Sequence, residues 1–248
     1  MNDQRRGLRP FFSYFGGKWT LAPRYPAPEH DLIIEPFAGL AGYATRYPDR
    51  EVVLVERAPH IAVLWRWLIH VSVDEVMGLP LDPREAEGLC EGAQILIRFW
   101  CARGRMRTPT TISSWMTSGR WPASFWGAYA RDRIAAQVPR IRHWRVIEGD
   151  YTEAPDARAT WFVDPPYFGD RHYCVRVDDY ASLARWCQAR RGLVIVCEQE
   201  GADWLPFRPF RLAKSFARGA YNEVVWVQRD AAISMKVTEE VLEGTNQR

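Results

Sequence analysis

The feature that most constrains the fold of this chain is a series of short apolar runs, most of which end on an acidic residue. The runs are rich in Val, Ile and Leu and cover residues 31–35, 51–56, 145–150, 160–164 and 193–198. Short runs of branched residues are typical of strands that are buried on both faces of a parallel sheet. They predict the framework of an α/β protein.

Helical segments lie between these strands, and a hairpin follows them. Apolar residues recur at helical spacing over 58–71, and residues 183–190 are also predicted to form a helix. Two further strands, over 210–216 and 223–228, flank Ala217-Arg218-Gly219-Ala220, which suits a hairpin turn. The pattern predicts a doubly wound α/β fold with a mostly parallel, seven-stranded sheet that ends in a C-terminal hairpin.

Strand signals stop after Val73 and resume only near residue 145. Asp82-Pro83-Arg84-Glu85 is a helix start, with Asp as cap and Pro at the first position, and it predicts a helix to about Cys101. A loop is predicted over 103–120 and a second helix over 122–138. We therefore expect a core domain of residues 1–72 and 146–230, a helical insertion over 73–145, and a peripheral or disordered tail over 231–248.

The helical insertion carries most of the positive charge. Residues 92–145 contain ten Arg and a single acid, so this segment has a charge of +9 in a chain of net charge +3. It also contains eight aromatic residues, which are Phe99, Trp100, Trp115, Trp121, Phe125, Trp126, Tyr129 and Trp144. Clustered Arg neutralises phosphates and flat rings stack on bases, so the segment predicts a nucleic-acid-binding surface. The alternative is a solvated basic helix face whose rings belong to the core.

Several classes of protein are excluded by what the sequence lacks. The 248 residues suffice for one large domain or for a core domain with an insertion. There is no apolar stretch of ~20 residues and no apolar signal core, so we expect a cytoplasmic protein without a membrane span. The five Cys form no CxxC pair and no cluster with His, which predicts reduced thiols and no metal site.

Polar residues gather where the predicted strands end. In open α/β sheets, ligands bind outside the carboxyl ends of the strands. Here those ends are Glu35-Pro36-Phe37, Glu56, Asp150 and Asp164-Pro165-Pro166-Tyr167. We expect a binding site at this edge of the sheet.

The tetrapeptide Asp164-Pro165-Pro166-Tyr167 is the most specific of these segments. Neither proline has an N–H group, so the tetrapeptide cannot continue the strand and instead forms a stiff turn. Such a turn can hold a planar amine if Asp164 and the Pro165 carbonyl accept its two hydrogens while Tyr167 stacks on its ring. An ordinary surface turn is the alternative for this tetrapeptide taken alone.

Three segments together resemble one enzyme family. Tyr14-Phe15-Gly16-Gly17-Lys18, Glu35-Pro36-Phe37-Ala38-Gly39 and Asp164-Pro165-Pro166-Tyr167 occur in the order found in the Dam-type (D12 class, alpha-group) DNA adenine-N6 methyltransferases. The likeness runs from about Phe12 to Gln228. The resemblance implies a Rossmann-like S-adenosylmethionine-dependent methyltransferase fold in which the insertion recognises the target. It also implies S-adenosylmethionine as methyl donor, no metal, DNA as partner, and a flipped-out adenine as acceptor.

The resemblance also implies roles for individual residues. Asp164, Pro165, Pro166 and Tyr167 match the catalytic turn. Glu56 matches an acid that can accept both ribose hydroxyls of the donor, and Asp150 matches the position that receives its adenine amino group. The donor-binding residues implied are Tyr14, Phe15, Gly17, Lys18, Glu35, Pro36, Phe37, Ala38, Gly39, Ala41, Gly42, Glu56, Arg57, Asp150, Tyr151 and Asp164.

The chain departs from the family pattern at two positions. A second glycine is usual two residues after Gly39, but this chain has Ala41, with Gly42 one position later. Phe15 stands where a smaller residue is common. We expect an altered loop that still binds the donor, because alanine is small enough to leave the close approach of the backbone open.

DNA contacts are expected from the insertion and from the residues after the catalytic turn. The candidates are Arg103, Arg105, Arg107, Arg120, Trp121, Arg171 and His172. Arg218, Asn222 and Glu223, near the hairpin, are candidates to contact DNA or to seal the pocket, with an ordinary turn role as the alternative. The insertion matches the family's target-recognition region by its place only, so no recognition sequence is implied.

Other functions remain open from the sequence. A cytosine-N4 methyltransferase uses the same amine chemistry, although Ser in place of Asp164 is commoner there, and a non-catalytic DNA-binding decoy would retain the fold. Methylation of an RNA adenine or a protein amide fits less well. A restriction-modification role would require a separate endonuclease, because the chain is too short to include one, and a solitary phage enzyme is the alternative. We expect a monomer or weak dimer in the cytoplasm of a bacterium or of a phage-infected host.

Overall fold

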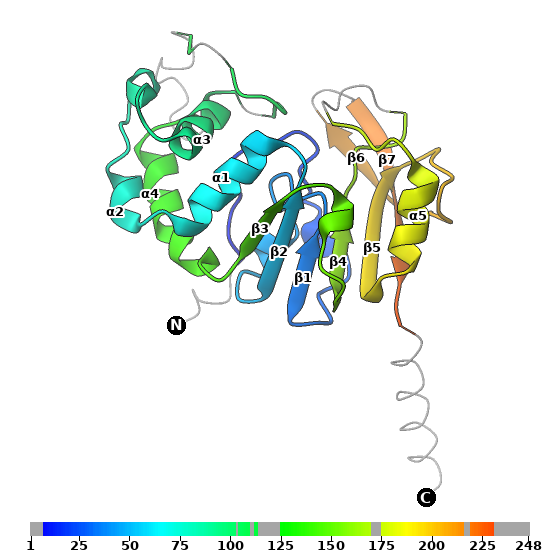
Figure 1. The fold of residues 1–248 in the computed structure, drawn as a ribbon. Coiled ribbons are helices and arrows are strands. Elements are labelled where there is room, and N and C mark those ends of the chain that lie inside the picture. The colour runs from blue at the N-terminus through cyan, green and yellow to red at the C-terminus, as the bar shows by residue number, and fades with distance from the viewer. Residues whose placement is uncertain are drawn as a thin grey trace, which may run out of the picture.

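In the described part of the chain, seven strands form one mixed sheet. The computed structural model describes residues 7–102, 104–109, 112–113, 125–169, 175–215 and 219–230. The strands are β1 (Leu32–Glu35), β2 (Glu51–Glu56), β3 (Arg145–Glu148), β4 (Arg158–Val163), β5 (Arg191–Gln199), β6 (Arg208–Ser215) and β7 (Gly219–Gln228). Their order across the sheet is β3-β2-β1-β4-β5-β7-β6 (Figure 1). Neighbours from β3 to β5 are parallel, whereas β7 is antiparallel to β5 and β6. The predicted mostly parallel sheet with a terminal hairpin is confirmed.

The direction of winding reverses between β1 and β4. β1 pairs with β2 on one side and with β4 on the other, although β2 and β3 come between β1 and β4 in the sequence. The connections that leave such a pair of strands run to opposite sides, so a crevice opens at their carboxyl ends. This is the edge of the sheet at which the sequence predicts a binding site.

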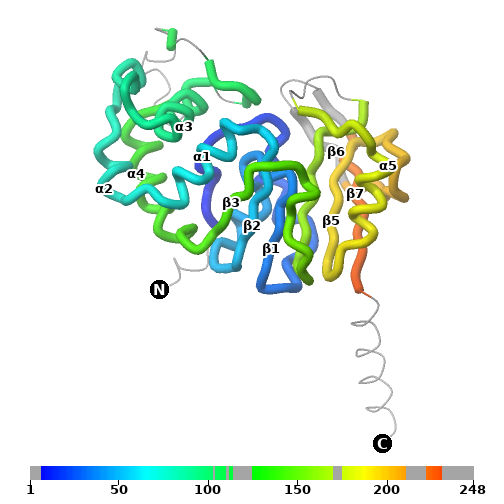
Figure 2. Tube along the Cα trace, viewed as in Figure 1, coloured from blue at the N-terminus to red at the C-terminus, as the bar shows by residue number. Residues whose placement is uncertain are grey.

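Of the described helices, two cover the faces of the sheet and three gather at one end of it. They are α1 (Pro59–His70), α2 (Val73–Met77), α3 (Glu91–Cys101), α4 (Ala128–Gln137) and α5 (Tyr180–Gln188). Figure 2 shows α2, α3 and α4 gathered beyond β3, while α5 lies beside β5. Helix α3 packs on α1, and α2 packs on α4.

Alternate residues of each strand enter two separate buried clusters. Ile33 belongs to one cluster together with Trp65 of α1. Ile34 belongs to the other together with Leu183 of α5. Since successive side chains of a strand point to opposite faces, the sheet is buried on both faces, as its continuous apolar runs predict.

The helices of the insertion share the larger of these clusters. Phe99 and Trp100 of α3 are buried in the same cluster as Trp65. Trp100 Nε1 donates a hydrogen bond to the Phe11 carbonyl (2.9 Å), and Trp126 Nε1 donates to the Pro80 carbonyl (2.7 Å). These rings are therefore core residues, and the described part of 73–145 does not enclose a core of its own.

Two predicted helices are wrong at their N-terminal ends. Asp82 caps only a short 3₁₀ turn over residues 83–86, and α3 begins later, at Glu91. The break contains Gly88, whose φ of +95° lies in the left-handed region and cannot continue a right-handed helix. The second helix, predicted over 122–138, begins at Ala128, and its predicted part before residue 125 lies outside the described residues.

Two further elements differ from prediction. The strand predicted over 145–150 ends at Glu148, because Asp150 instead caps a 3₁₀ turn. The short helix α2 was not predicted, although its capping box is readable: Ser72 Oγ accepts from Glu75 N (3.1 Å) and Glu75 Oε2 accepts from Ser72 N (2.7 Å). Among the described residues, no helix has the length and apolarity that crossing a membrane requires.

Gly192 tests the close packing of β5 on β4. Its φ is +106°, and a Cβ atom there would lie 2.1 Å from the carbonyl oxygen of Ala159. Gly192→Ala must push the two strands apart, and we expect the free energy of unfolding to fall by about 3 kcal/mol or more. In the control, Gly88→Ala, φ is +95° but nothing lies within 4 Å, so the loss should be about 1–2 kcal/mol. Equal losses in urea denaturation would contradict this packing.

Candidate active site

A cavity of about 270 Å³ lies at the carboxyl ends of β1, β2 and β4. Its walls come from the N-terminal segment, the β1–β2 loop, the start of α1, and the segments that follow β3 and β4. Of the sequence-predicted donor-binding residues, those that line it are Tyr14, Phe15, Gly17, Lys18, Glu35, Pro36, Phe37, Ala38, Gly39, Gly42, Glu56, Arg57, Asp150, Tyr151 and Asp164. Within the predicted set, Ala41 alone does not line it. Segments far apart in the sequence thus meet in one place.

Two glutamates at strand ends shape the β1–β2 loop. Glu35 is buried and accepts a hydrogen bond from Ala44 N (2.5 Å). Glu56 accepts one from Gly39 N (2.9 Å) and another from Ala58 N (2.8 Å). These bonds fold the loop back over the tips of β1 and β2, where its backbone faces the cavity.

The same loop contains two left-handed residues. Gly39 has φ of +45° and Ala41 has φ of +50°, the one positive value among the described residues that are not glycine. Left-handed backbone costs an L-residue about 1–2 kcal/mol, and this is the position at which a second glycine is usual in the resembled family. Ala41 is buried and does not line the cavity, so its methyl group leaves the cavity open.

Burial changes the acidity of both glutamates. Burial raises the pKa of Glu35 to about 8, although the hydrogen bond from Ala44 N lowers it, and the charge of Asp164 adds to the rise. Burial also raises the pKa of Glu56, against the hydrogen bonds from Ala58 and Gly39. A cation beside such a carboxyl group favours its ionised form. A cation bound in the cavity would therefore lower the raised pKa of Glu35 and of Glu56.

The turn after β4 is held in place from the outside. Tyr180 Oη donates a hydrogen bond to the Pro166 carbonyl. Glu198 Oε2 accepts from Phe168 N (3.0 Å), and Gln199 Nε2 donates to the Phe168 carbonyl (3.0 Å). Glu198 is itself buried, which raises its pKa to about 7. The stiff turn that the two prolines predict is thus fixed to β5 and α5.

Asp164 forms an ion pair with a buried lysine. Lys18 Nζ lies 2.8 Å from Asp164 Oδ1 and 3.0 Å from Oδ2, and it donates to the Gly16 carbonyl at 3.0 Å. The side chains are 3% and 18% exposed, respectively, and both line the cavity. The pair joins the N-terminal segment to a turn 146 residues later.

Tyr167 does not face the cavity. Its ring is only 2% exposed and is absent from the cavity lining, as is Pro165. Its hydroxyl donates to Glu223 Oε1 (2.9 Å), and Lys18 Nζ lies 4.7 Å from the centre of its ring. The structure therefore uses the Tyr167 ring to support Lys18, and stacking of Tyr167 on a ligand stays a prediction.

Two aromatic rings form part of the cavity wall. The rings of Phe37 and Tyr151 lie 5.6 Å apart with an angle of 28° between their planes, and both line the cavity. Tyr151 is held edge-on by Trp186, at 5.1 Å. Asp150 lies beside them, where its Oδ1 accepts from Thr152 N (3.3 Å). A flat ring with a polar edge fits this arrangement.

Sequence reasoning missed the segment between the turn and α5. Val175, Arg176, Val177, Asp178 and Asp179 also line the cavity. Arg57 Nη1 spans the site: it lies 3.7 Å from Asp150 Oδ2 and 3.9 Å from Asp178 Oδ2, and it donates to the Arg176 carbonyl (3.3 Å). No periodic pattern marks this segment, but it connects β4 to a helix, which is where ligand-binding residues gather in such sheets.

One histidine also reaches the site. His60 lines the cavity together with Met106. Its Nε2 is 3.0 Å from the Met106 carbonyl oxygen, and its ring stacks on Phe99 at 6.0 Å. His60 therefore ties the described part of the basic segment to the start of α1.

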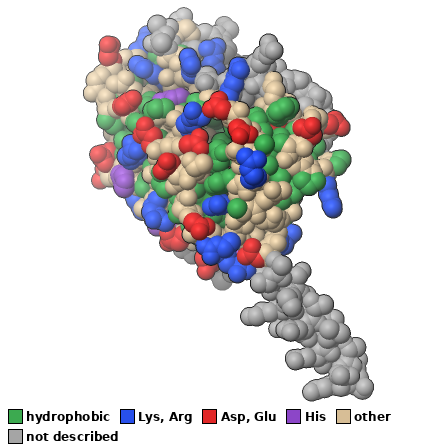
Figure 3. Space-filling model, turned by 45° about the vertical axis from the view of Figure 1, so that its right-hand side comes forward, with side chains coloured by type: hydrophobic (Ala, Val, Ile, Leu, Met, Phe, Trp, Pro, Cys, Tyr) green, Lys and Arg blue, Asp and Glu red, His purple; other side chains and the backbone are tan. Residues whose placement is uncertain are grey.

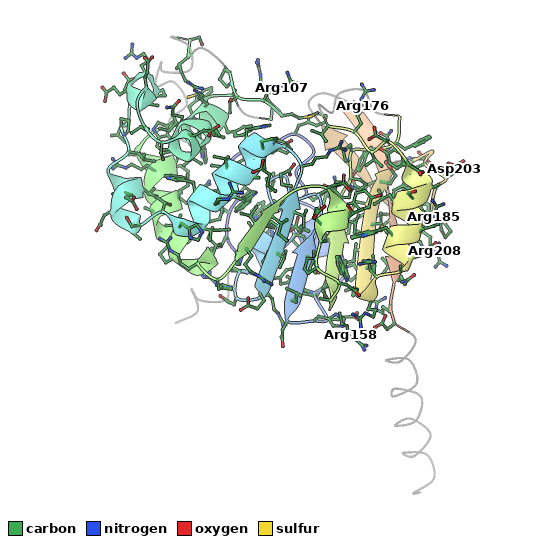
Figure 4. The ribbon with its side chains drawn as sticks, in the orientation of Figure 1. Arg107, Arg158, Arg176, Arg185, Asp203 and Arg208 are labelled. Atoms are coloured by element: carbon green, nitrogen blue, oxygen red, sulfur yellow. The ribbon has the colours of Figure 1, made fainter. Side chains whose placement is uncertain are left out.

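The predicted DNA-contacting residues are described in part. Arg105 and Arg107 are exposed, and Arg107 lies with Arg176 at the edge where the strands end, whereas Arg158 lies at the opposite edge (Figure 4). On the face in Figure 3, charged side chains of both signs are interspersed with hydrophobic ones. The predicted contacts that lie outside the described residues are Arg103, Arg120, Trp121, Arg171, His172 and Arg218.

Two candidates near the hairpin have structural partners. Asn222 Nδ2 donates to Glu200 Oε2 (2.5 Å). Glu223 is fully buried in β7, so it has no exposed surface with which to contact DNA. In the parts of the chain that the structure describes, no group of three or more His, Cys, Asp or Glu could hold a metal ion.

Comparisons with known proteins add no relative. No protein-family model matches this chain, and no curated protein matches it in sequence.

Glu35→Gln tests the buried carboxyl group through the pH dependence of stability. The pKa of Glu35 is about 8 in the folded chain, against a reference value of 4.5 that applies to the unfolded chain. Between these values the unfolded state binds fewer protons, so this group's contribution to stability falls as pH rises. Glutamine still accepts from Ala44 N but does not ionise. We expect the variant to gain at least about 1 kcal/mol relative to wild type between pH 5 and pH 8.5 in urea denaturation. Parallel pH profiles would contradict the assignment.

Proposed function

We propose that this protein is a DNA adenine-N6 methyltransferase with a Rossmann-like fold that uses S-adenosylmethionine. The observation that carries the proposal is the convergence of residues 14–18 and 35–39 with Asp164 and Pro166 on one cavity at the switch point of the sheet. A tetrapeptide such as 164–167 could be an ordinary turn. An ordinary turn has no reason to share a cavity with the two other segments that resemble the same family.

The chemistry of the cavity walls fits the donor. S-adenosylmethionine carries its reactive methyl group on a positively charged sulfur. When the methyl group is transferred, the sulfur becomes the neutral thioether of S-adenosylhomocysteine. Glu35 is a buried acidic group in the cavity wall, and a cation bound beside it would favour its ionised form. Each Glu56 oxygen accepts one backbone N–H and retains a second lone pair, so Glu56 can still accept ribose hydroxyls. Phe37 and Tyr151 offer flat apolar surface for a purine.

The acidic turn supplies what the acceptor needs. The exocyclic nitrogen of adenine is a poor nucleophile because its lone pair is delocalised into the ring. Hydrogen bonds from its two hydrogens favour a pyramidal nitrogen and localise the lone pair. Asp164 lines the cavity and can accept one of them, whereas the Pro165 carbonyl, predicted to accept the other, would have to turn toward the cavity, because Pro165 does not line it. Positive charge develops on this nitrogen as it bonds to the methyl carbon, and a carboxylate stabilises that charge. We expect Asp164 to take the proton that the methylated amine then loses.

DNA binding is assigned to the basic segment and to the cavity edge. A base inside a duplex cannot reach a cavity at the strand tips, so it must be flipped out, which costs a few kcal/mol. Phosphate contacts from exposed arginines such as Arg105 and Arg107 offset this cost. Phe168, 45% exposed directly after the turn, is a further apolar contact at the same edge.

Asp164→Asn tests the catalytic turn. Asparagine keeps the shape of Asp164 and an oxygen that accepts from Lys18, but it carries no charge and is a poor proton acceptor. We expect wild-type protein to transfer labelled methyl groups from S-adenosylmethionine to DNA, and the variant to do so about 10²-fold more slowly. Calorimetry should show donor Kd values within about threefold of each other.

Two results would contradict this role for Asp164. A variant as fast as wild type would remove Asp164 from the mechanism. A wild-type protein that binds DNA but neither binds the donor nor transfers methyl groups would be the non-catalytic decoy.

Charge reversal tests the DNA surface. Because each phosphate contact contributes about 0.9 to the slope of log K against log salt, Arg105→Glu with Arg107→Glu should lower that slope by about 2 and weaken DNA binding. The control is Arg158→Glu at the opposite edge of the sheet, which should leave the slope unchanged (Figure 4). Equal effects of the two changes in a fluorescence-anisotropy titration would refute the assignment.

A further inference from the structure

A second buried acid lies beside the Lys18–Asp164 pair. Glu223 belongs to β7, between β5 and β6, and its side chain is fully buried. Its Oε1 accepts hydrogen bonds from Tyr167 Oη (2.9 Å) and Tyr25 Oη (2.7 Å). The same oxygen lies 3.8 Å from Lys18 Nζ. Glu223 therefore connects two residues of the candidate site to the hairpin.

Folding alone gives little reason for a carboxylate at this position. A buried charge is costly unless its lone pairs are satisfied, and well-packed apolar replacements of buried ion pairs are often more stable. Among the described residues, Glu223 Oε2 has no hydrogen-bond partner. The chain thus keeps a negative charge beside Lys18 while leaving one carboxylate oxygen unsatisfied, which points to a use for the charge.

We propose that Glu223 is a positioning residue that holds the Lys18 ammonium and the Tyr167 phenol in place while an acceptor amine binds to Asp164. Its catalytic consequence rests on the proposed function. Glu223 does not line the cavity, so it acts through these two residues and not through contact with either ligand.

The distances indicate how Glu223 acts on Lys18. The ammonium lies 2.8 Å from Asp164 Oδ1 and 3.8 Å from Glu223 Oε1. An amine that donates to Asp164 competes with Lys18 for the oxygens of that carboxylate. The charge of Glu223 keeps the ammonium in the site during this exchange. Lys18, Asp164 and Glu223 together also carry one net negative charge, which favours the positive charge that develops on the amine.

Tyr167 completes the support of the ammonium. Its ring centre lies 4.7 Å from Lys18 Nζ, within the range of a cation–π contact. The orientation of the ring is fixed by its hydroxyl, which donates to Glu223. One carboxylate thus controls both the charge beside the ammonium and the aromatic ring on which it rests.

The reactivity of Lys18 tests this inference without reference to catalysis. Glu223→Gln keeps an oxygen that accepts from both tyrosines and removes the charge. We expect sulfosuccinimidyl acetate to acetylate Lys18 at least about fivefold faster in this variant, because a nearby carboxylate stabilises the unreactive ammonium. Peptide mass spectrometry gives the rate, with Lys214 and Lys236 as internal references. An unchanged rate would overturn the proposal.

Turnover tests the catalytic consequence. We expect Glu223→Gln to lower kcat for methyl transfer about tenfold or more, with donor Kd within about threefold and the melting temperature retained. A purely structural role predicts the reverse, a lower melting temperature with kcat unchanged. The control is Tyr43→Phe, which removes a different buried tyrosine hydroxyl, bonded to the Pro26 carbonyl (2.7 Å). It should lower the melting temperature and leave Lys18 reactivity and kcat unchanged.

Failure of this inference is distinguishable from failure of the proposed function. If wild-type protein transfers no methyl group, the function fails, and the acetylation rate still decides whether Glu223 holds Lys18. If wild type is active and Glu223→Gln has the same kcat, the positioning role alone is overturned. If Glu223→Gln does not fold, Tyr167→Phe replaces it in the test, since the Tyr167→Phe variant lacks one hydrogen bond to Glu223. A kcat lowered about threefold or more in Tyr167→Phe supports the positioning role, and an unchanged kcat overturns it.

Discussion

The ion pair between Lys18 and Asp164 is the contact on which the candidate site depends. A lysine that is only 3% exposed has lost its hydration, and partner charges must replace it. Those charges come from the tip of β4 and from β7, so the N-terminal segment, the turn and the hairpin must all reach their places before the ammonium is satisfied. Loss of both partner charges would leave the buried ammonium uncompensated, which is strongly destabilising.

The acids around this pair give the cavity its chemical character. Burial raises the pKa of Glu35 to about 8 and that of Glu198 to about 7, and it also raises the pKa of Glu56. Carboxyl groups in this state lose stability as pH rises, and under the proposed function a cation bound beside Glu35 and Glu56 would favour their ionised forms. A loss of folding stability at buried carboxyl groups is common in functional sites.

The sequence predicts the framework better than the side-chain directions. β2 coincides with the predicted strand over 51–56, because a short run of branched apolar residues is typical of a strand that is buried on both faces. The rule that ligands bind at strand ends leads to Glu35, Glu56 and Asp164, which the structure brings into one cavity. Local pattern could not give the direction of the Tyr167 ring, because Glu223, 56 residues later, sets it through a hydrogen bond.

Other differences have local causes that a periodic pattern does not report. Gly88 breaks the helix predicted from Asp82 because its backbone is left-handed. Glu198 was readable only as the end of a strand, yet its carboxylate fixes the acidic turn through Phe168 N. Glu223 lies mid-strand in β7, where its sequence context resembles any hairpin residue, and only the folded sheet brings it to Lys18.

Asp164 and its turn are proposed to hold the amino group of an extruded adenine against a methyl donor. The most direct test is mass spectrometry of nucleosides from the DNA of cells that lack their own DNA methylation and express this protein in folded form. We expect N6-methyladenine in that DNA. DNA that contains N4-methylcytosine instead, or no methylated base, would contradict it.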